Sequence, residues 1–196
     1  MPYEKLKRTI DLVISITALV FLAPLIFALY LIILLNMGGG PVFRQIRPGL
    51  RGRPFEMYKF RTMIDPPCDN ALSDEARITS LGRFLRGSSL DELPELFNVF
   101  KGQMSLVGPR PLLMEYLGKY TPTQMRRHDV LPGITGLAQV RGRNNLSWRH
   151  KFKYDLFYVK KRSLLLDFRI IFETIVVVFL RTGFRSHGEQ KKFGEN

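Results

Sequence analysis

A run of 24 residues without a charged side chain, from Leu12 to Leu35, restricts this chain more than any other feature of its sequence. About 20 apolar residues in helical conformation cross the hydrocarbon core of a bilayer, so the run is long enough for a membrane helix. A secretory signal peptide fits poorly, because the apolar run is too long and no small-residue cleavage site follows it. We therefore expect an N-terminal membrane helix.

Two features argue against a straight crossing of the membrane. Pro24 lies in the middle of the run, where a proline removes one helical hydrogen bond and kinks the helix. Both ends are flanked by basic residues, which favour the cytoplasmic side. They are Lys5, Lys7 and Arg8 before the run and Arg44, Arg47, Arg51 and Arg53 after it. A helix that bends at Pro24 and returns to the same side satisfies both features; a single straight span is the alternative.

The net charge of +13 on 196 residues requires an anionic partner. Nucleic acid, anionic lipid headgroups and phosphorylated substrates all meet this requirement. The length suffices for one domain with a hydrophobic core. The single cysteine, Cys68, excludes an intrachain disulfide, and the three histidines, His128, His150 and His187, lack the spacing of a zinc site.

Two adjacent carboxylates, Asp91 and Glu92, lie between a basic segment and an apolar helical pattern. Pro94 follows them, and proline is tolerated best in the first turn of a helix. We therefore expect the pair at a helix N-terminus, where free N–H groups and the helix dipole favour negative charge. The alternative is a capping box, in which Ser89 and Glu92 only cap the helix at S-x-x-E spacing.

Short helices are expected on both sides of the acidic pair. A helix from about Thr79 to Arg86 would end at Gly87, because glycine suits a helix C-terminus. Arg86 then lies a few residues before the pair and is placed to reach a phosphate bound there. The helix after the pair covers 93–101 and ends at Gly102.

Two short runs of alternating polarity around a glycine and proline turn, 42–45 and 55–63, predict a β-hairpin. In the second run Lys59 and Arg61 share one face, so they could point together at an anion. The alternative is a basic edge strand exposed to solvent.

Proline- and glycine-rich stretches follow. Prolines on both sides of Arg110 restrict its backbone, and a rigidly held arginine suits bidentate phosphate recognition. An arginine exposed in a proline turn is the alternative. The glycines of 132–140 let backbone approach a ligand closely, and Arg143 follows with its charge. Alone this is a weak phosphate-loop signal, because the Walker pattern is absent.

The remaining segments are expected to be mainly helical. Residues 112–130 carry a helical pattern with mixed charge. From Trp148 onward aromatic residues interleave with lysines, a composition that suits either stacking on bases or an interfacial helix. The segment from Leu164 to Leu180 is apolar but contains three charged residues, which favours a helix lying on the bilayer or packed on the core over a second crossing.

Six stretches, in this order, resemble the bacterial monotopic phosphoglycosyl transferases, which start glycan assembly on polyprenyl phosphate. They are KRTIDL at 7–12, FRQIRPG at 43–49, YKFRTM at 58–63, SLDELP at 89–94, LVGPRP at 106–111 and PGITGLAQV at 132–140. The resemblance covers nearly the whole chain. One departure is Ala23-Pro24, where the family often has Ser-Pro at the bend of its membrane helix.

The resemblance implies that a UDP-sugar gives its phosphosugar to polyprenyl (undecaprenyl) phosphate and releases UMP. It implies that Asp91 is the nucleophile that carries the phosphosugar covalently, that Glu92 is its partner carboxylate, and that Mg²⁺ is the cofactor, with Asp91 and Glu92 as its ligands. Glu92 would either position Mg²⁺ or assist proton transfer. Cations nearby would neutralise the diphosphate. The candidate phosphate and nucleotide ligands are Lys59, Arg61, Arg86, Arg110, Gln139 and Arg143. The runner-up is a polyprenyl-phosphate glycosyltransferase that releases UDP.

The expected fold is α+β and mostly helical. A re-entrant, monotopic membrane helix covers 1–36, a catalytic domain with a small β-hairpin and interfacial amphipathic helices covers 37–184, and a polar tail covers 185–196. The resemblance places the active site at the cytoplasmic face of the bacterial inner membrane, with UDP-sugar, polyprenyl phosphate and membrane lipids as partners. It leaves a homodimer open.

No nucleic-acid partner is expected. A membrane-tethered nucleic-acid binder nevertheless remains a rival function, because of the charge and the basic, aromatic C-terminal half. The other rival is a membrane scaffold for glycan assembly in which Asp91 and Glu92 only cap a helix.

Overall fold

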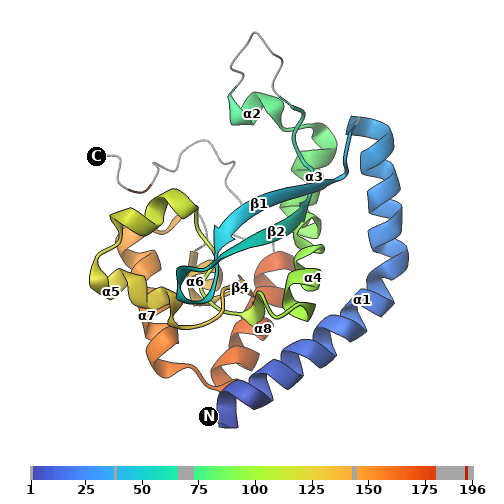
Figure 1. Cartoon of the computed structure of the whole chain (residues 1–196). Coiled ribbons are helices and arrows are strands. Elements are labelled where there is room, and N and C mark those ends of the chain that lie inside the picture. The colour runs from blue at the N-terminus through green and yellow to red at the C-terminus, as the bar shows by residue number, and fades with distance from the viewer. Residues whose placement is uncertain (1, 38, 66–72, 143–144, 180–192, 194–196) are drawn as a thin grey trace.

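The N-terminal apolar run forms one long helix, α1 (Pro2–Met37), in a computed structural model that describes residues 2–37, 39–65, 73–142, 145–179 and 193. Figure 1 shows that α1 runs along one side of the molecule and bends part-way. Pro24 lies inside the helix, where it removes a backbone hydrogen bond and permits the bend. Within the described residues, α1 is the one helix long and apolar enough to cross a membrane.

The two ends of α1 pack against the protein body and its middle does not. Asp11 and Ser15 are buried near the N-terminal end, and Leu29 and Ile33 near the C-terminal end. Between them no side chain of α1 is buried, and Phe21 is 79% exposed. An apolar surface of this kind marks a contact with a membrane or another protein rather than with water.

The rest of the described chain forms short helices around two small sheets, so the expected mostly helical α+β fold is confirmed. After α1 the elements are β1 (Val42–Pro48), η1 (Leu50–Gly52), β2 (Pro54–Phe60), α2 (Asp74–Arg77), α3 (Ser80–Ser88), η2 (Leu90–Glu92), α4 (Glu95–Phe100), β3 (Ser105–Val107), η3 (Met114–Lys119), α5 (Pro122–Met125), η4 (Arg126–Asp129), β4 (Gly133–Thr135), α6 (Leu137–Gly142), α7 (Trp148–Lys161) and α8 (Leu164–Phe179).

The predicted β-hairpin is confirmed, and its first strand is longer than predicted. β1 and β2 pair antiparallel from Val42 opposite Phe60 to Pro48 opposite Pro54. Phe55 and Met57, two residues apart on β2, are buried against residues of and after α4, whereas Phe60 at the end of the strand is buried against α1 and α3. The hairpin therefore holds the region of the acidic pair between itself and α1.

Several predicted helix limits were wrong. Helix α3 continues through Gly87 to Ser88, and Ser89 takes the left-handed conformation at φ 58°. Residues 112–130 form the separate turns η3, α5 and η4, because Pro122 lacks the N–H that a continuous helix would need and instead begins α5 after a capping box at Thr121. Gly102, at φ 77°, ends the turn after α4 as expected.

The glycine-rich stretch 132–140 is regular structure rather than a loop. β4 pairs in parallel with β3, and α6 follows directly. Gly108 and Gly133 let the two segments cross closely, since a Cβ on Gly133 would lie 2.1 Å from the backbone nitrogen of Gly108. These glycines therefore have a packing role.

Helix α8 presents an apolar face to the outside. Leu165, Phe168 and Phe172 are between 52% and 82% exposed and recur at helical spacing, while Asp167 and Ile170 on the other side are buried. This arrangement fits the two expectations, a helix packed on the core or lying on the bilayer, better than a second membrane crossing.

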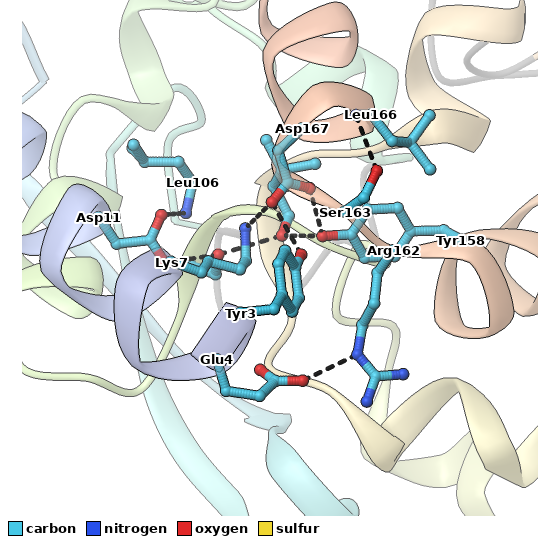
Figure 2. A network of polar contacts seen from close by, with 12 residues as sticks. Tyr3, Glu4, Lys7, Asp11, Leu106, Tyr158, Arg162, Ser163, Leu166 and Asp167 are labelled. Atoms are coloured by element: carbon cyan, nitrogen blue, oxygen red, sulfur yellow. Dashed lines mark hydrogen bonds and ion pairs between the residues drawn. The ribbon is translucent and has the colours of Figure 1, made fainter. Parts of the chain in front are cut away.

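A buried polar network holds the N-terminal end of α1 to α7 and α8 (Figure 2). The carboxylate of Asp167 accepts hydrogen bonds from the Tyr3 hydroxyl at 2.8 Å, the Lys7 ammonium at 2.9 Å and the Tyr158 hydroxyl at 2.7 Å. Asp167 and Lys7 are largely buried, so neither charge has water as an alternative partner.

A second carboxylate ties α1 to β3. The side chain of Asp11 accepts a hydrogen bond from the Ser105 hydroxyl at 2.7 Å and another from the Leu106 backbone N–H at 3.2 Å (Figure 2). Arg8 donates to the carbonyls of Val99 and Phe100 at the end of α4. The start of α1 is therefore fixed to the body that its far end also contacts.

We expect Asp167→Asn to destabilise the protein by about 3 kcal/mol, because the change removes the carboxylate that pairs with the buried Lys7 ammonium and leaves only the Asp11 charge nearby. Chemical unfolding of the purified protein in detergent measures this. Glu173→Gln, on the same helix but in ion pairs with the partly exposed Arg141 and Arg169, is the control and should cost less than about 1 kcal/mol. Equal losses in both variants would contradict a special role for Asp167.

Candidate active site

The acidic pair lies on η2, a single 3₁₀ turn between α3 and α4. The left-handed Ser89 allows α3 to end and η2 to begin without an intervening loop. Ser89 makes no side-chain cap hydrogen bond, and the Glu92 carboxylate is bound elsewhere, so the capping-box alternative is wrong.

Glu92 is held between two cations. Its Oε1 accepts from the Lys59 ammonium at 2.7 Å and from the Arg110 guanidinium at 2.5 Å. Burial alone would raise the pKa of Glu92, but Arg110 and Lys59 outweigh it and hold the pKa well below its usual range. Glu92 is therefore an anion throughout the physiological pH range.

Asp91 has the opposite environment. Asp91 is 8% exposed, and no residue within the described part of the chain donates a hydrogen bond to its carboxylate. Burial, followed by the charge of Glu92, raises the pKa of Asp91 to about 6, while Lys59, Arg110 and Arg86 act in the opposite direction. At neutral pH Asp91 is mostly an anion whose oxygens accept no hydrogen bond from the part of the chain that the structure describes.

A third carboxylate, Glu95, was not identified from the sequence. It is 1% exposed and lies 3.1 Å from the Lys59 ammonium. Its spacing to Asp91 (i+4) and Glu92 (i+3) was the available signal, because residues so spaced on a helical segment share one face. The apolar residues around Glu95 indicated only the buried face of a helix.

The predicted cations occupy different places around the pair. Lys59 and Arg110 contact Glu92 directly. Arg86 donates through Nε to the Thr62 hydroxyl at 2.9 Å and lies close enough to lower the pKa of Asp91. Arg61, unlike Lys59, makes its contacts away from the acidic pair. It lies beyond the end of β2, donates to the Met63 carbonyl at 3.1 Å and forms an ion pair with Asp65.

Arg110 is positioned from behind by a buried ion pair. Arg127, 3% exposed, donates through Nη2 to the Arg110 carbonyl at 2.7 Å and to the Asp155 carboxylate at 2.8 Å. This contact fixes the backbone of Arg110 to η4 and α7. Arg110 is therefore not the freely exposed arginine that was the alternative.

The last two predicted ligands are not brought to the pair by any contact in the described structure. Gln139 donates to the Ile134 carbonyl at 2.7 Å and so joins β4 to α6. Arg143 lies outside the described residues.

The donor set fits Mg²⁺ in part. Both contacts to Glu92 use Oε1, and Asp91 has no hydrogen-bond donor among the described residues, so hard carboxylate oxygens remain available there. Within the described residues no cluster of three or more His, Cys, Asp or Glu forms a complete protein cage. Mg²⁺ commonly uses one or two carboxylates together with water and substrate phosphate, which suits this pair.

Comparison with known proteins gives one family across the chain. The family model described as bacterial sugar transferase matches residues 2–181. The uncharacterized sugar transferase EpsL of Bacillus subtilis is 49% identical over 180 residues, which is 91% of this chain and 89% of EpsL.

Relatives with named activities are longer. The UDP-glucose:undecaprenyl-phosphate glucose-1-phosphate transferase of Klebsiella pneumoniae is 38% identical over 191 residues, and the undecaprenyl-phosphate galactose phosphotransferase of Salmonella typhimurium is 41% identical over 198 residues. These matches cover 89% and 91% of this chain but only 40% and 41% of the two relatives. The match of the family model over 2–181 shows that the chain belongs to the bacterial sugar transferase family.

Proposed function

We propose that this protein transfers a phosphosugar from a UDP-sugar to a polyprenyl phosphate, undecaprenyl phosphate in bacteria, and releases UMP. The observation that carries the proposal is the pairing of a buried, uncommitted Asp91 with a Glu92 whose charge is already neutralised by Lys59 and Arg110. Relatives named as sugar-phosphate transferases on undecaprenyl phosphate support the substrate classes.

In the first step an oxygen of Asp91 attacks the phosphorus that carries the sugar. The new Oδ–P bond forms as the bond from that phosphorus to the bridging oxygen of the diphosphate breaks, and the electron pair leaves with UMP. A carboxylate is a weak nucleophile, so competing hydrogen bonds to its oxygens would hinder attack, and among the described residues none donates to Asp91. Glu92 is less suited to this step, because Arg110 and Lys59 hold its pKa well below the usual range and a less basic carboxylate is a weaker nucleophile.

In the second step a phosphate oxygen of polyprenyl phosphate attacks the same phosphorus. The Oδ–P bond breaks, the polyprenyl diphosphosugar forms and Asp91 returns as a carboxylate. Lys59, Arg86 and Arg110 surround the pair with positive charge, which stabilises the phosphate oxygens in both steps.

Mg²⁺ held by Asp91 and Glu92 would neutralise diphosphate oxygens and make the reacting phosphorus more electrophilic. Glu92 would present its carboxylate to the ion in one orientation, since Lys59 and Arg110 both hold it.

The membrane setting follows from α1. Because both ends of α1 pack on one body, we propose that the helix enters the bilayer, bends at Pro24 and returns on the cytoplasmic side, so that the protein is monotopic in the inner membrane. The exposed apolar face of α8 would lie on the same surface. A polyprenyl phosphate headgroup at that surface is then available to the site.

We expect purified protein with Mg²⁺, a short polyprenyl phosphate and a suitable UDP-sugar to release UMP. Asp91→Asn should lower turnover at least about a thousandfold, because no nucleophile remains. With label in the phosphate next to the sugar and no acceptor present, wild-type protein should retain bound label and Asp91→Asn should not. Asp129→Asn, at an exposed aspartate, is the control. Release of UDP instead of UMP would overturn the mechanism.

Glu95 should make stability depend on pH. Burial, with Glu92 adding to it and Lys59 opposing, raises the pKa of Glu95 from 4.5 to about 7. Between these two pKa values the native state keeps the proton that the unfolded chain loses. The free energy of unfolding therefore falls as pH rises through this range, by at most about 3 kcal/mol.

Glu95→Gln should therefore become progressively more stable than the wild type between pH 5 and pH 8. Thermal unfolding in detergent with EDTA measures the difference at each pH. Glu115→Gln, at an exposed glutamate, should show no such trend. A constant difference between Glu95→Gln and wild type across this range would mean that Glu95 is ionised throughout.

Cysteine labelling tests the membrane topology. In a Cys68→Ser background, Lys5→Cys before the membrane run and Glu115→Cys on the body should both resist an impermeant thiol reagent in intact bacterial cells and react after permeabilisation, because the proposed helix returns to its own side. Labelling of Lys5→Cys alone in intact cells would indicate a straight span.

A further inference from the structure

Glu95 is a buried carboxylate that the proposed reaction does not use. It lies in the first turn of α4, is 1% exposed, and its Oε1 accepts no well-formed hydrogen bond from the described residues. The Lys59 ammonium lies 3.1 Å from this same oxygen. Keeping a carboxyl group away from water costs free energy, so its place beside an active-site cation points to a role beyond packing.

Lys59 connects Glu95 to the acidic pair. Its ammonium donates to Glu92 Oε1 at 2.7 Å, and within the described part of the chain its ion-pair partners are Glu92 and Glu95. The two glutamates are three residues apart, a spacing that places both side chains on one face of a helical segment. An ammonium has three N–H donors, so with one on Glu92 and one facing Glu95 a third remains for a phosphate oxygen.

The charged groups that face Glu95 come from four segments of the chain. They are Arg47 on β1, Lys59 on β2, Glu92 on η2 and Arg110 after β3. Burial raises the pKa of Glu95 to about 7. The charges of Lys59 and Arg110 oppose this rise, and that of Glu92 adds to it. Below this pH Glu95 is mostly a neutral acid, whose carbonyl oxygen can still accept a hydrogen bond.

The protonation state of Glu95 sets the net charge beside the acidic pair. Lys59 and Arg110 carry two positive charges, and Glu92 carries one negative charge. While Glu95 is protonated, one positive charge is left for an anionic ligand; once Glu95 is ionised, none is left. Asp91 is already mostly ionised at the pH where Glu95 changes its charge, so it does not alter this difference.

We propose that Glu95 is a positioning residue that acts through Lys59 on the binding of the donor diphosphate. In its neutral form Glu95 is a second acceptor, which keeps Lys59 beside Glu92 without competing for its charge. In its ionised form it pairs with the ammonium and weakens the attraction of Lys59 for the diphosphate. This inference rests on the proposed function, because the diphosphate is that of the UDP-sugar donor.

The test is the binding of UDP-glucose to full-length protein in detergent with Mg²⁺, measured by calorimetry from about pH 6.5 to about pH 8.5. All proteins carry Asp91→Asn, so that no phosphosugar is transferred during the titration. Asp91 is not among the groups that shift the pKa of Glu95, so this background leaves its titration in place. Each phosphate of UDP-glucose has a single acidic group of low pKa, so the ligand keeps its charge across this range.

In the Asp91→Asn protein the Kd for UDP-glucose should rise about tenfold from the lower to the higher pH. Adding Glu95→Gln should remove this rise, because the amide keeps an acceptor oxygen and cannot ionise. Adding Glu95→Leu, which removes the acceptor, should weaken binding about fivefold at the lower pH. This difference between the two variants separates positioning of Lys59 from simple packing. Glu115→Gln, at an exposed glutamate, is the control and should bind as the Asp91→Asn protein does.

Unfolding curves check that each variant is folded. The same rise of Kd with and without Glu95→Gln, a Kd that does not change with pH in the Asp91→Asn protein, or no detectable binding of UDP-glucose would overturn the role of Glu95.

The two proposals fail in different ways. Release of UMP by wild-type protein, together with UDP-glucose binding that does not depend on Glu95, would overturn only the positioning role. Binding that weakens with pH through Glu95, with no phosphosugar transfer by wild-type protein from any UDP-sugar, would overturn only the reaction.

Discussion

The buried contacts of Glu92 with Lys59 and Arg110 are the interaction on which the candidate site depends. They join three segments that are distant in sequence: the hairpin, the turn η2 and the segment after β3. Two adjacent carboxylates would repel each other in a buried site, but here one charge is neutralised by protein cations. The other carboxylate, Asp91, then remains ionised near neutral pH without being bound by those cations.

Buried charged groups also attach the N-terminal end of helix α1 to the protein body. Asp167 gathers Tyr3, Lys7 and Tyr158, and Asp11 binds β3, so the first turns of α1 are attached by charged groups that are costly to separate once buried. The far end of α1 is attached instead by apolar packing around Ile33 and Phe60. Between these two attachments, around the bend at Pro24, no side chain of α1 is buried.

Local signals in the sequence predicted the hairpin, the long helix with its inner proline, the helical region after the acidic pair and the proximity of Lys59 and Arg110 to that pair. Predictions failed where packing between distant segments decides the outcome. Ser89 rather than Gly87 ends α3, and Arg61 pairs with Asp65 rather than the acidic pair, because β2 stops at Phe60. The burial of Glu95 beside Lys59 was not predicted, because an apolar helical pattern does not show which distant side chain will contact a carboxylate within it.

Three carboxylates lie near one lysine, and their environments separate their roles. Glu92 is paired and stays charged, whereas Glu95 is almost fully buried and holds its proton to about neutral pH. Asp91 alone combines a charge at neutral pH with oxygens that no described residue binds. A nucleophile for phosphorus needs both properties, because a protonated carboxyl cannot attack and a hydrogen-bonded carboxylate attacks poorly. The geometry around Lys59 therefore favours Asp91 over either glutamate as the nucleophile of the proposed reaction.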